Sequence, residues 1–298
     1  LLRERRTLES RRNSWARNFQ SCKKSKMTEI NILAESIKSR FGTVKRARGN
    51  FLYTEKRVRL TDMFLEGGRA VLGWGSDFFS GWTIFKNIIS RGLTGSFVTD
   101  FNAVSKNSGL SRLSRAVSAL LNDERIAVIC NSKEDALKKS LAISKDGTFV
   151  YRPWNAQNID WKNAACVLIA PPLAWAQNIW IVAVKSEFIE DSKIDFCSAF
   201  IPAALEAAVT RSFYDLIKAL QVREEKDWFK YDKVLTKYWT RKGPWLFPKI
   251  PQEKYENFVQ HCLDCDLVVS PFFSVPSIVP FGADSGVFKK LEKSPFDF

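Results

Sequence analysis

The chain has 298 residues, of which 45% are hydrophobic and 13% aromatic, a composition typical of a globular protein with a substantial core. It excludes a chain that is disordered over most of its length. The formal net charge is +14, but residues 1–26 supply +7 of it, because they hold nine Lys or Arg and two Glu. The charge that would suggest an acidic partner is therefore concentrated in a short leader.

This leader begins with Leu, has almost no apolar periodicity and precedes Met27, the first methionine. It has two interpretations. It is a basic arm that neutralises phosphates on nucleic acid or an anionic membrane, or it is upstream sequence with no fold of its own and the chain properly begins at Met27. We favour the second. The leader lacks the apolar segment of a secretory signal, so export is not indicated.

Apolar spacing predicts a first helix at 27–40 and then a strand that buries Val58 and Leu60. A glycine ribbon follows this strand. Because glycine readily takes a positive φ, the ribbon lets the backbone turn and pass close to something small. A helix is expected at 77–91, and Gly92 ends it. The ribbon glycines are Gly67, Gly68, Gly73 and Gly75.

The middle of the chain predicts a helix at 108–121, a strand at 126–130, a capped helix at 131–144 and a strand at 148–151. The last three form a β-α-β unit, in which the two strands run parallel. We therefore expect an α/β fold with a mostly parallel sheet and flanking helices.

Residues 165–184 carry no charge and have the length of a membrane span. However, Pro171 and Pro172 lie in the first half of this segment, and Gln177 and Asn178 lie in the second. These residues would leave polar groups unsatisfied in lipid. The segment therefore predicts two buried strands, at 166–170 and 179–184, joined by a proline turn.

The last third predicts helices at 203–221 and 253–264 and a strand at 267–270, with a charge-rich joint at 224–232. We divide the chain into a basic leader at 1–26, an N-terminal segment with the glycine ribbon at 27–100, an α/β large domain at 101–222 and a small α+β domain at 223–298.

Aromatic and basic residues alternate at 228–249, as on surfaces that stack on single-stranded nucleic acid. The alternative, which we favour, is an amphipathic helix whose aromatic side chains are buried.

The cysteines have no spacing that predicts a disulfide framework, and four of them lie in apolar surroundings, as reduced thiols of a cytoplasmic protein would. His261, the one histidine, adjoins Cys262 and Cys265, but a zinc site needs two further ligands that the sequence does not bring near. We expect no metal site and no hydrolytic triad. The six cysteines are Cys22, Cys130, Cys166, Cys197, Cys262 and Cys265.

Asn131 or Ser132 is expected to cap the helix at 131–144, and Glu134 and Asp135 suit its positive first turn. A helix start with a hydroxyl is also a ready site for phosphate. The two carboxylates would repel a phosphate, so the arrangement is better as a cap than as a phosphate cup.

Together these segments resemble the fold type I pyridoxal-phosphate-dependent transferases, most closely the aminotransferases. RVRLTDMFLEGGRAVLGWG at 57–75 resembles that family's strand, aspartate and glycine turn, with Asp62 and Gly73 in matching places. NSKEDALKKSLAIS at 131–144 is similar to the family's Asn-Ser-Gly-Ser/Thr-Glu-Ala helix start. The resemblance extends in order and pattern over most of 27–298.

The resemblance implies a homodimer in which Asn131 and Ser132 bind the phosphate of pyridoxal phosphate. Lys185, at the end of a buried strand, is the candidate for the Schiff-base lysine, and the substrate would be an amino acid. The chain departs from the family because Lys133 and Glu134 replace the cup's glycine and hydroxyl, and because its large domain is trimmed.

Three hypotheses follow for function. The chain is an aminotransferase-like enzyme, or it keeps the fold without the cofactor and serves as a binding or assembly partner. The third, nucleic-acid binding through the basic leader, we regard as the weakest. Lys185 is equally well explained as a lysine that leaves the core at the end of a strand.

Overall fold

The computed structural model describes residues 29–75, 80–106, 108–144, 149–155, 161–176, 178–190 and 197–298. The chain divides into two units, at residues 1–40 and 41–298. The described element of the first unit is helix α2 (Glu29–Phe41), which confirms the helix expected from the apolar spacing. The leader lies outside the described residues. In the part of the chain that is described, no helix is long and apolar enough to cross a membrane.

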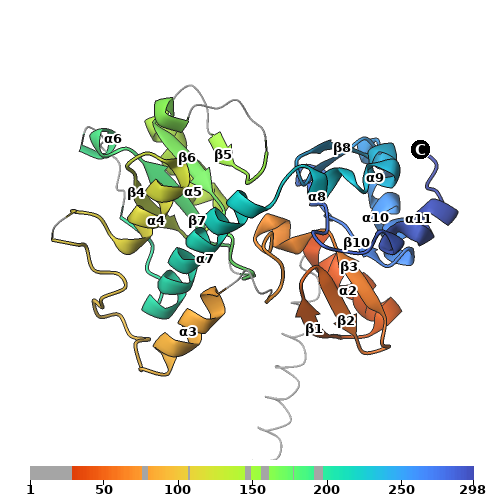
Figure 1. Cartoon of the computed structure of the whole chain (residues 1–298), viewed down its shortest axis with the longest axis horizontal. Helices are drawn as coiled ribbons and strands as arrows, with labels where there is room; N and C mark the ends of the chain where they lie inside the picture. The colour runs from red at the N-terminus through yellow and green to blue at the C-terminus, as the bar shows by residue number, and fades with distance from the viewer. Residues whose placement is uncertain are drawn as a thin grey trace, which may run out of the picture. The chain divides into compact units, whose positions relative to one another are not determined.

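The central sheet of the second unit has the strand order β4-β7-β6-β5 (Figure 1). The two strands predicted within residues 165–184 are confirmed as β6 (Cys166–Ile169) and β7 (Trp180–Val184). Every residue of both strands is buried, which explains why the segment carries no charge. The remaining strands are β4 (Ile126–Cys130) and β5 (Phe149–Tyr151), as predicted.

The prediction of a mostly parallel sheet requires correction for the described residues. β5 pairs with β6 in parallel, but β7 is antiparallel to both of its neighbours, β4 and β6. The two strands of the predicted β-α-β unit, β4 and β5, belong to one sheet but do not pair, because β7 and β6 lie between them. The sheet is therefore mixed.

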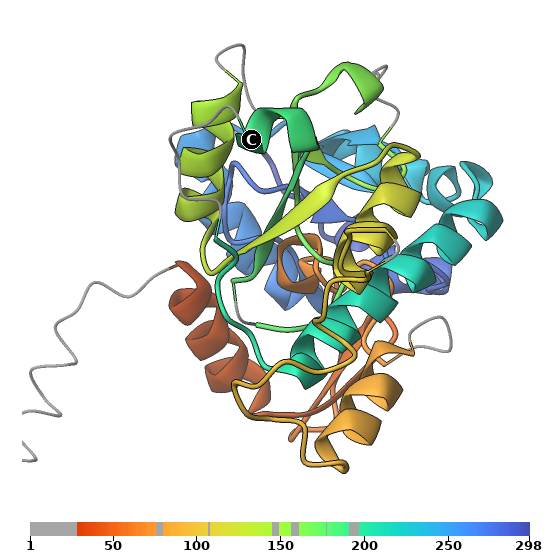
Figure 2. The same ribbon diagram turned by 90° about the vertical axis from the view of Figure 1, so that its left-hand side faces the viewer.

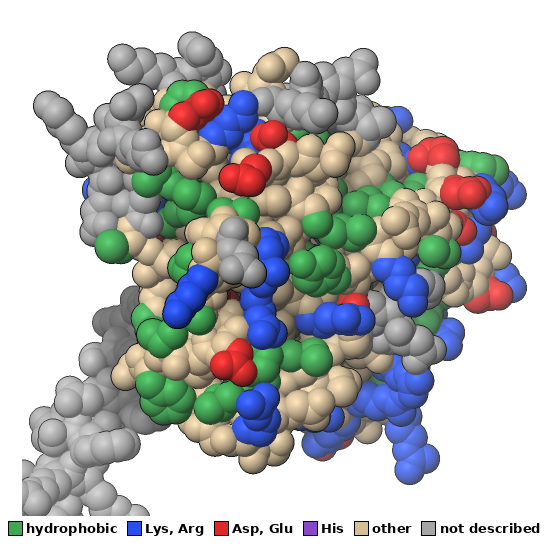
Figure 3. Space-filling model, turned by 60° about the vertical axis from the view of Figure 1, so that its left-hand side comes forward, with side chains coloured by type: hydrophobic (Ala, Val, Ile, Leu, Met, Phe, Trp, Pro, Cys, Tyr) green, Lys and Arg blue, Asp and Glu red, His purple; other side chains and the backbone are tan. Residues whose placement is uncertain are grey.

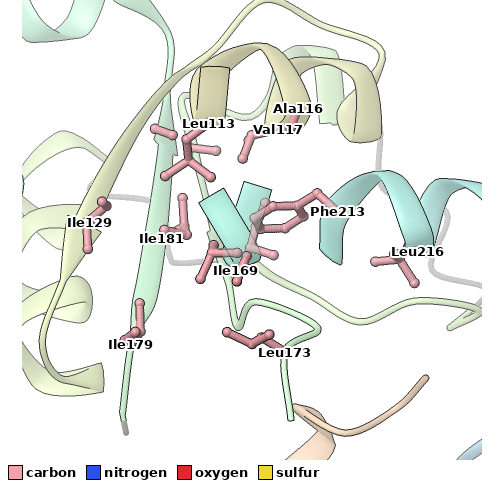
Figure 4. Packing of buried hydrophobic residues seen from close by; sticks show 14 of the residues in the cluster. Leu113, Ala116, Val117, Ile129, Ile169, Leu173, Ile179, Ile181, Phe213 and Leu216 are labelled. Carbon is pink, nitrogen blue, oxygen red and sulfur yellow. The ribbon is translucent and has the colours of Figure 1, made fainter. Parts of the chain in front are cut away.

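Helices cover both faces of this sheet because its side chains alternate. Ile181 and Ala183 of β7 pack in the core that includes residues of α4 (Arg112–Leu121) and α7 (Ala203–Val222). Figure 4 shows Leu113, Val117 and Phe213 from these helices converging with Ile169 and Ile181 of the sheet. Val182 and Val184 instead pack in the core that includes Ala136 of α5 (Lys133–Ile143). Figure 2 shows α5 on one side of the sheet and α4 beside α7 on the other.

Two further helices complete this part of the fold. α3 (Gly81–Ile89) packs along α7, with Ile88 against Ala204 and Ala207, and it covers most of the helix expected at 77–91; residues 76–79 lie outside the described residues. α6 (Ser186–Glu190) follows β7 directly.

Serine hydroxyls accept hydrogen bonds from backbone N–H groups along the outer edge of β4, which is an edge strand of the sheet. The backbone N–H of Arg125 donates to Ser118 Oγ at 2.9 Å, and that of Ala127 donates to Ser114 Oγ at 3.0 Å. The N–H of Ile129 donates to Ser198 Oγ at 3.1 Å. An exposed row of free N–H groups would invite another strand, so these hydroxyls close the edge of the sheet.

Replacing Ser114 with alanine is expected to lower the free energy of unfolding by about 1–2 kcal/mol, because the buried N–H of Ala127 loses its acceptor. Urea denaturation followed by circular dichroism measures the change. The matched control is Ser39→Ala, which removes an exposed hydroxyl that donates within helix α2. A loss no larger than that of the control would contradict the role assigned to Ser114.

Two smaller sheets bring distant parts of the chain together. One has the order β1-β2-β3-β10, and its C-terminal strand β10 pairs in parallel with β3, so that the N–H of Met63 donates to Val268 O. The other has the order β11-β9-β8. The strands are β1 (Val44–Arg48), β2 (Phe51–Thr54), β3 (Arg59–Asp62), β8 (Trp239–Lys242), β9 (Trp245–Pro248), β10 (Leu267–Val268) and β11 (Ser277–Ile278).

The C-terminal helices pack around these strands. α10 (Tyr255–Asp264) confirms the helix expected at 253–264, and its buried face carries Phe258, Val259 and Cys262 as the spacing predicts. The other helices are α8 (Lys226–Phe229), α9 (Asp232–Tyr238) and α11 (Lys289–Lys293), and the 3-10 turns are η1 (Leu65–Gly68), η2 (Trp161–Asn163), η3 (Gln252–Lys254) and η4 (Ser285–Phe288).

Candidate functional site

The N-terminus of α5 is the first part of the expected cofactor site. Ser132 caps the helix as predicted, and its Oγ accepts a hydrogen bond from the Asp135 N–H at 3.0 Å. Glu134 and Asp135 both lie in the first turn, where their charge complements the helix dipole. Asp135 also pairs with Lys139 at 3.4 Å. The cap and the carboxylates already stabilise this helix end, and they oppose a bound phosphate.

Lys133 and Asn131 flank this cap and are exposed. The ammonium of Lys133 lies 5.8 Å from the centre of the Trp180 ring, on the opposite strand. A phosphate cup needs a glycine at this position so that the backbone can approach the anion closely. This chain instead has Lys133, whose ammonium lies near the Trp180 ring.

Lys185 lies at the opposite end of the sheet from Ser132. β4 and β7 run antiparallel, with Cys130 opposite Trp180 and Ile126 opposite Val184. Ser132 follows the Cys130 end of this pair and Lys185 follows the Val184 end. Four steps along a strand separate these ends by about 13 Å. The structure therefore does not bring the predicted lysine and the predicted phosphate ligands into one site.

Arginine and aromatic side chains lie at the strand ends near Ser132, where Cys130 of β4 pairs with Trp180 of β7. Arg69 donates from Nη2 to Asn178 Oδ1 and to Ile179 O, both at 2.9 Å, and its guanidinium lies 5.4 Å from the Trp180 ring centre. The cavity beside Arg69, which Leu173 and Ile179 also line, has a volume of about 10 Å³. Such a space holds about one water molecule.

A second group of such contacts lies around Arg223, which is buried. Its guanidinium lies 3.9 Å from the Phe281 ring centre and 5.2 Å from that of Trp154, and its Nη1 donates to Val71 O at 3.1 Å. Burial lowers the pKa of Arg223 to about 10. Nearby, Trp245 Nε1 donates to Pro153 O at 2.7 Å. No spacing pattern in the sequence predicts these contacts, because they join residues from distant parts of the chain.

The glycine ribbon approaches other parts of the protein. Gly73 has φ +92°, and a Cβ there would lie 3.3 Å from the backbone of Gly49, which exchanges two hydrogen bonds with Trp74. A Cβ on Gly68 would lie 2.7 Å from the Trp245 ring. The close approach predicted for the ribbon is present, and in the described residues its neighbours are Gly49 and Trp245.

Asp62 organises the start of this ribbon. Its Oδ1 accepts from the N–H groups of Phe64 and Leu65, and its Oδ2 accepts from Trp74 Nε1 at 2.8 Å. Burial raises the pKa of Asp62, and these three donors act in the opposite direction. Both carboxylate oxygens of Asp62 therefore accept hydrogen bonds from residues 64–74 of the same segment.

The candidate residues Lys185, Asn131 and Ser132 do not fit pyridoxal phosphate in this arrangement. The candidate lysine is at the far end of the sheet, two carboxylates occupy the first turn of α5, and the cavity beside Arg69 is too small for a pyridine ring. We derive no catalytic step through this cofactor.

The predictions for His261 and the cysteines can also be compared with the structure. His261 Nε2 lies 2.8 Å from Ser294 O and 3.9 Å from Cys265 Sγ. The described part of the chain contains no group of three or more candidate metal ligands. Five cysteines are free thiols, and burial raises the pKa of Cys262 well above its ordinary value. Cys22 lies outside the described residues.

The tryptophans at 228–249 are buried, as are Tyr231 and Tyr238, whereas Phe229 is 53% exposed, so these residues do not form a continuous stacking surface. The exposed fractions of Trp228, Trp239 and Trp245 are 2%, 0% and 4%. Two short helices and a hairpin hold them, where one amphipathic helix was expected. Figure 3 shows a face on which hydrophobic side chains and charged side chains of both signs are intermixed.

Comparison with known proteins places the fold. No family model matches the chain. A protein described as uncharacterized from Treponema pallidum is 28% identical over 283 residues, covering 83% of this chain and 91% of that protein. Another, from Borreliella burgdorferi, is 25% identical over 258 residues, covering 83% and 89%.

Solved structures of aminotransferases are similar in fold. Ornithine aminotransferase from Plasmodium yoelii matches with a TM-score of 0.59 and 11% identity, covering 89% of this chain and 97% of that chain. Acetylornithine aminotransferase from Elizabethkingia anophelis matches with a TM-score of 0.59 and 10% identity, with the same coverage. An omega-transaminase from Sphaerobacter thermophilus gives a TM-score of 0.58 at 9% identity, covering 89% and 96%. The chain therefore has an aminotransferase-like α/β fold.

Proposed function

We propose that this chain is an aminotransferase-fold protein that lacks Schiff-base chemistry and serves as a binding or assembly partner. The observation that carries the proposal is the separation of Lys185 and Ser132 at opposite ends of the β4–β7 pair. A cofactor held by its phosphate at one end cannot form a covalent bond with a lysine at the other. The carboxylates of Glu134 and Asp135 support the same conclusion.

Catalysis is the second candidate. The fold likeness to ornithine and acetylornithine aminotransferases supports an enzyme that acts on an amino acid with pyridoxal phosphate. In that case the residues expected from the resemblance are Lys185 for the aldehyde and Asn131 and Ser132 for the phosphate. Such an enzyme requires a rearrangement that brings these residues together, which makes it the weaker candidate.

An absorbance spectrum distinguishes the two candidates. The chain is purified with added pyridoxal phosphate, its spectrum is recorded, and it is then reduced with borohydride and its peptides are mapped. We expect no aldimine band and no saturable adduct at Lys185, because Lys185 lies at the opposite end of the β4–β7 pair from Ser132. The spectra of Lys185→Ala and of the exposed-lysine control Lys138→Ala are expected to match that of the parent chain.

A saturable band, with reduction fixing one cofactor per chain to Lys185, would overturn the proposal and identify an enzyme. Labelling spread equally over Lys185 and Lys138 would show surface modification alone and would support the proposal.

We further propose that the protein is a homodimer, as the resemblance implies, and that it is cytoplasmic, which the five free cysteines support. Light scattering of the purified chain tests the first, since a dimer has twice the mass of one chain. A folded protein with the mass of one chain would contradict the homodimer, and assembly would then require a different partner.

A further inference from the structure

The structure contains a larger cavity on the outer side of β4, separate from the small cavity beside Arg69. Its volume is about 400 Å³, within the range of small-molecule sites. Four segments line it: residues 102–104, residues 109–114 at the start of α4, the strand β4, and residues 198–201 together with Glu206 of α7. The N–H of Ala199 donates to Ile129 O at 2.8 Å, so this last segment is tied to β4.

The walls of the cavity are mainly apolar. Leu110, Ile126 and Ile201 line it, as do the exposed side chains of Val104 and Phe200, with exposed fractions of 62% and 60%. Apolar residues at such exposure are suited to contact the hydrocarbon part of a ligand.

Most of the polar side chains in the cavity already have partners. Ser111 Oγ accepts from the Ser114 N–H, Ser114 Oγ accepts from the Ala127 N–H, and Ser198 Oγ accepts from the Ile129 N–H. Asn102 Oδ1 accepts from the N–H of Thr99. These groups are engaged in holding the cavity walls, so they are poor candidates for the main polar contact of a ligand.

Glu206 differs from them. It lines the cavity with 8% of its surface exposed, and its carboxylate has no hydrogen bond or ion pair to any residue in the described ranges. Thr210, one turn along the same face of α7, has a buried hydroxyl that also lacks a partner among the described residues. The Glu206 side chain is mostly removed from solvent and has no charged partner among the described residues, so a cation that enters the cavity would supply one.

We propose that this cavity binds a small organic cation, with a primary ammonium against the Glu206 carboxylate and an aromatic or aliphatic body against Leu110, Ile126 and Phe200. The site would not require pyridoxal phosphate, and it lies apart from Ser132 and Lys185. It therefore extends the proposed binding function to a ligand class.

The test compares phenethylamine with phenethyl alcohol, which has nearly the same shape without the charge. Isothermal titration calorimetry is done on the full chain at pH 8 and without pyridoxal phosphate, so that an aldimine cannot form. Phenethylamine is expected to bind about tenfold to hundredfold more tightly than the alcohol, because a charge-assisted hydrogen bond forms in a desolvated site.

Glu206→Gln keeps the shape of the side chain and removes its charge. It is expected to abolish the preference for the amine, while Glu256→Gln, on the exposed face of α10, leaves the preference unchanged. Circular dichroism confirms that each variant is folded.

Three results would overturn the proposal: no saturable binding of phenethylamine, equal affinity for amine and alcohol, or a preference that survives in Glu206→Gln. The borohydride experiment tests Lys185 and the calorimetry tests Glu206. The proposed function and the cation site can therefore be contradicted independently of each other.

Discussion

Replacing Arg125 with methionine is expected to lower the free energy of unfolding by about 3–5 kcal/mol, the largest effect of any single change considered for this chain. The Arg125 side chain is fully buried. Its Nη1 donates to Ala164 O at 2.7 Å and its Nη2 donates to Trp161 O at 2.6 Å. Its Nε donates to Asp123 Oδ2 at 2.8 Å. Methionine fills much of the same volume but leaves the Asp123 carboxylate and both carbonyls without these donors.

Urea denaturation followed by tryptophan fluorescence measures this loss. Arg125→Lys keeps the charge with fewer fixed donors and is expected to fall between the parent and Arg125→Met. Arg115→Met, on the exposed face of α4, is the matched control and should change stability by no more than about 0.5 kcal/mol. If Arg125→Met lay within 1 kcal/mol of the parent, the anchoring role of Arg125 between β4 and the approach to β6 would be wrong.

The substitution Glu206→Gln is expected to raise the free energy of unfolding. The increase over the parent chain should be about 2–3 kcal/mol larger at pH 8 than at pH 4.5. Burial raises the pKa of the Glu206 carboxyl from 4.5 to about 7. The folded state therefore holds this proton more tightly than the unfolded state. The contribution of Glu206 to stability is full below pH 4.5, declines as the pH rises and is lost above about pH 7.

The measurement is the free energy of unfolding of both proteins at several values of pH. Because the two chains share every other titrating group, their difference isolates Glu206. Glu256→Gln, which changes an exposed carboxylate, should show no comparable trend. A difference that stays constant from pH 4.5 to pH 8 would mean that the Glu206 carboxyl is not held in a desolvated place.

Local patterns predicted most of the helices and strands. The apolar stripe at 203–221 corresponds to α7, and the uncharged runs either side of Pro171 correspond to β6 and β7. Ser132 caps α5 because a hydroxyl three residues before an N–H can accept from it, a relation contained within four residues of sequence. Such features depend on neighbours along the chain, so the sequence is sufficient to find them.

The order of strands and the contents of the site depend on distant residues. No local signal places β7 between β4 and β6, and this placement is what puts Lys185 at the far end of the sheet from Ser132. The contacts of Arg69 with Asn178 and Arg223 with Val71 join residues more than 100 positions apart. Glu206 likewise reads as an ordinary helix residue until the cavity wall around it is known.

The parallel pairing of β3 with β10 also has a consequence for how the chain is made. Thr61 donates to Asp266 O and Met63 donates to Val268 O, so this sheet is completed by residues about 200 positions later. At translation rates of about 5–20 residues per second, β3 waits roughly 10–40 s for its partner to leave the ribosome. Contacts of this sequence separation also slow refolding of the full-length chain.

During that interval β3 presents an unpaired edge and Leu60, which is fully buried in the finished protein, has no complete cover. The nascent chain is thus most exposed to aggregation before its last 30 or so residues emerge. Expression at lower temperature or with added chaperone should raise the soluble yield of this protein more than changes to its surface do.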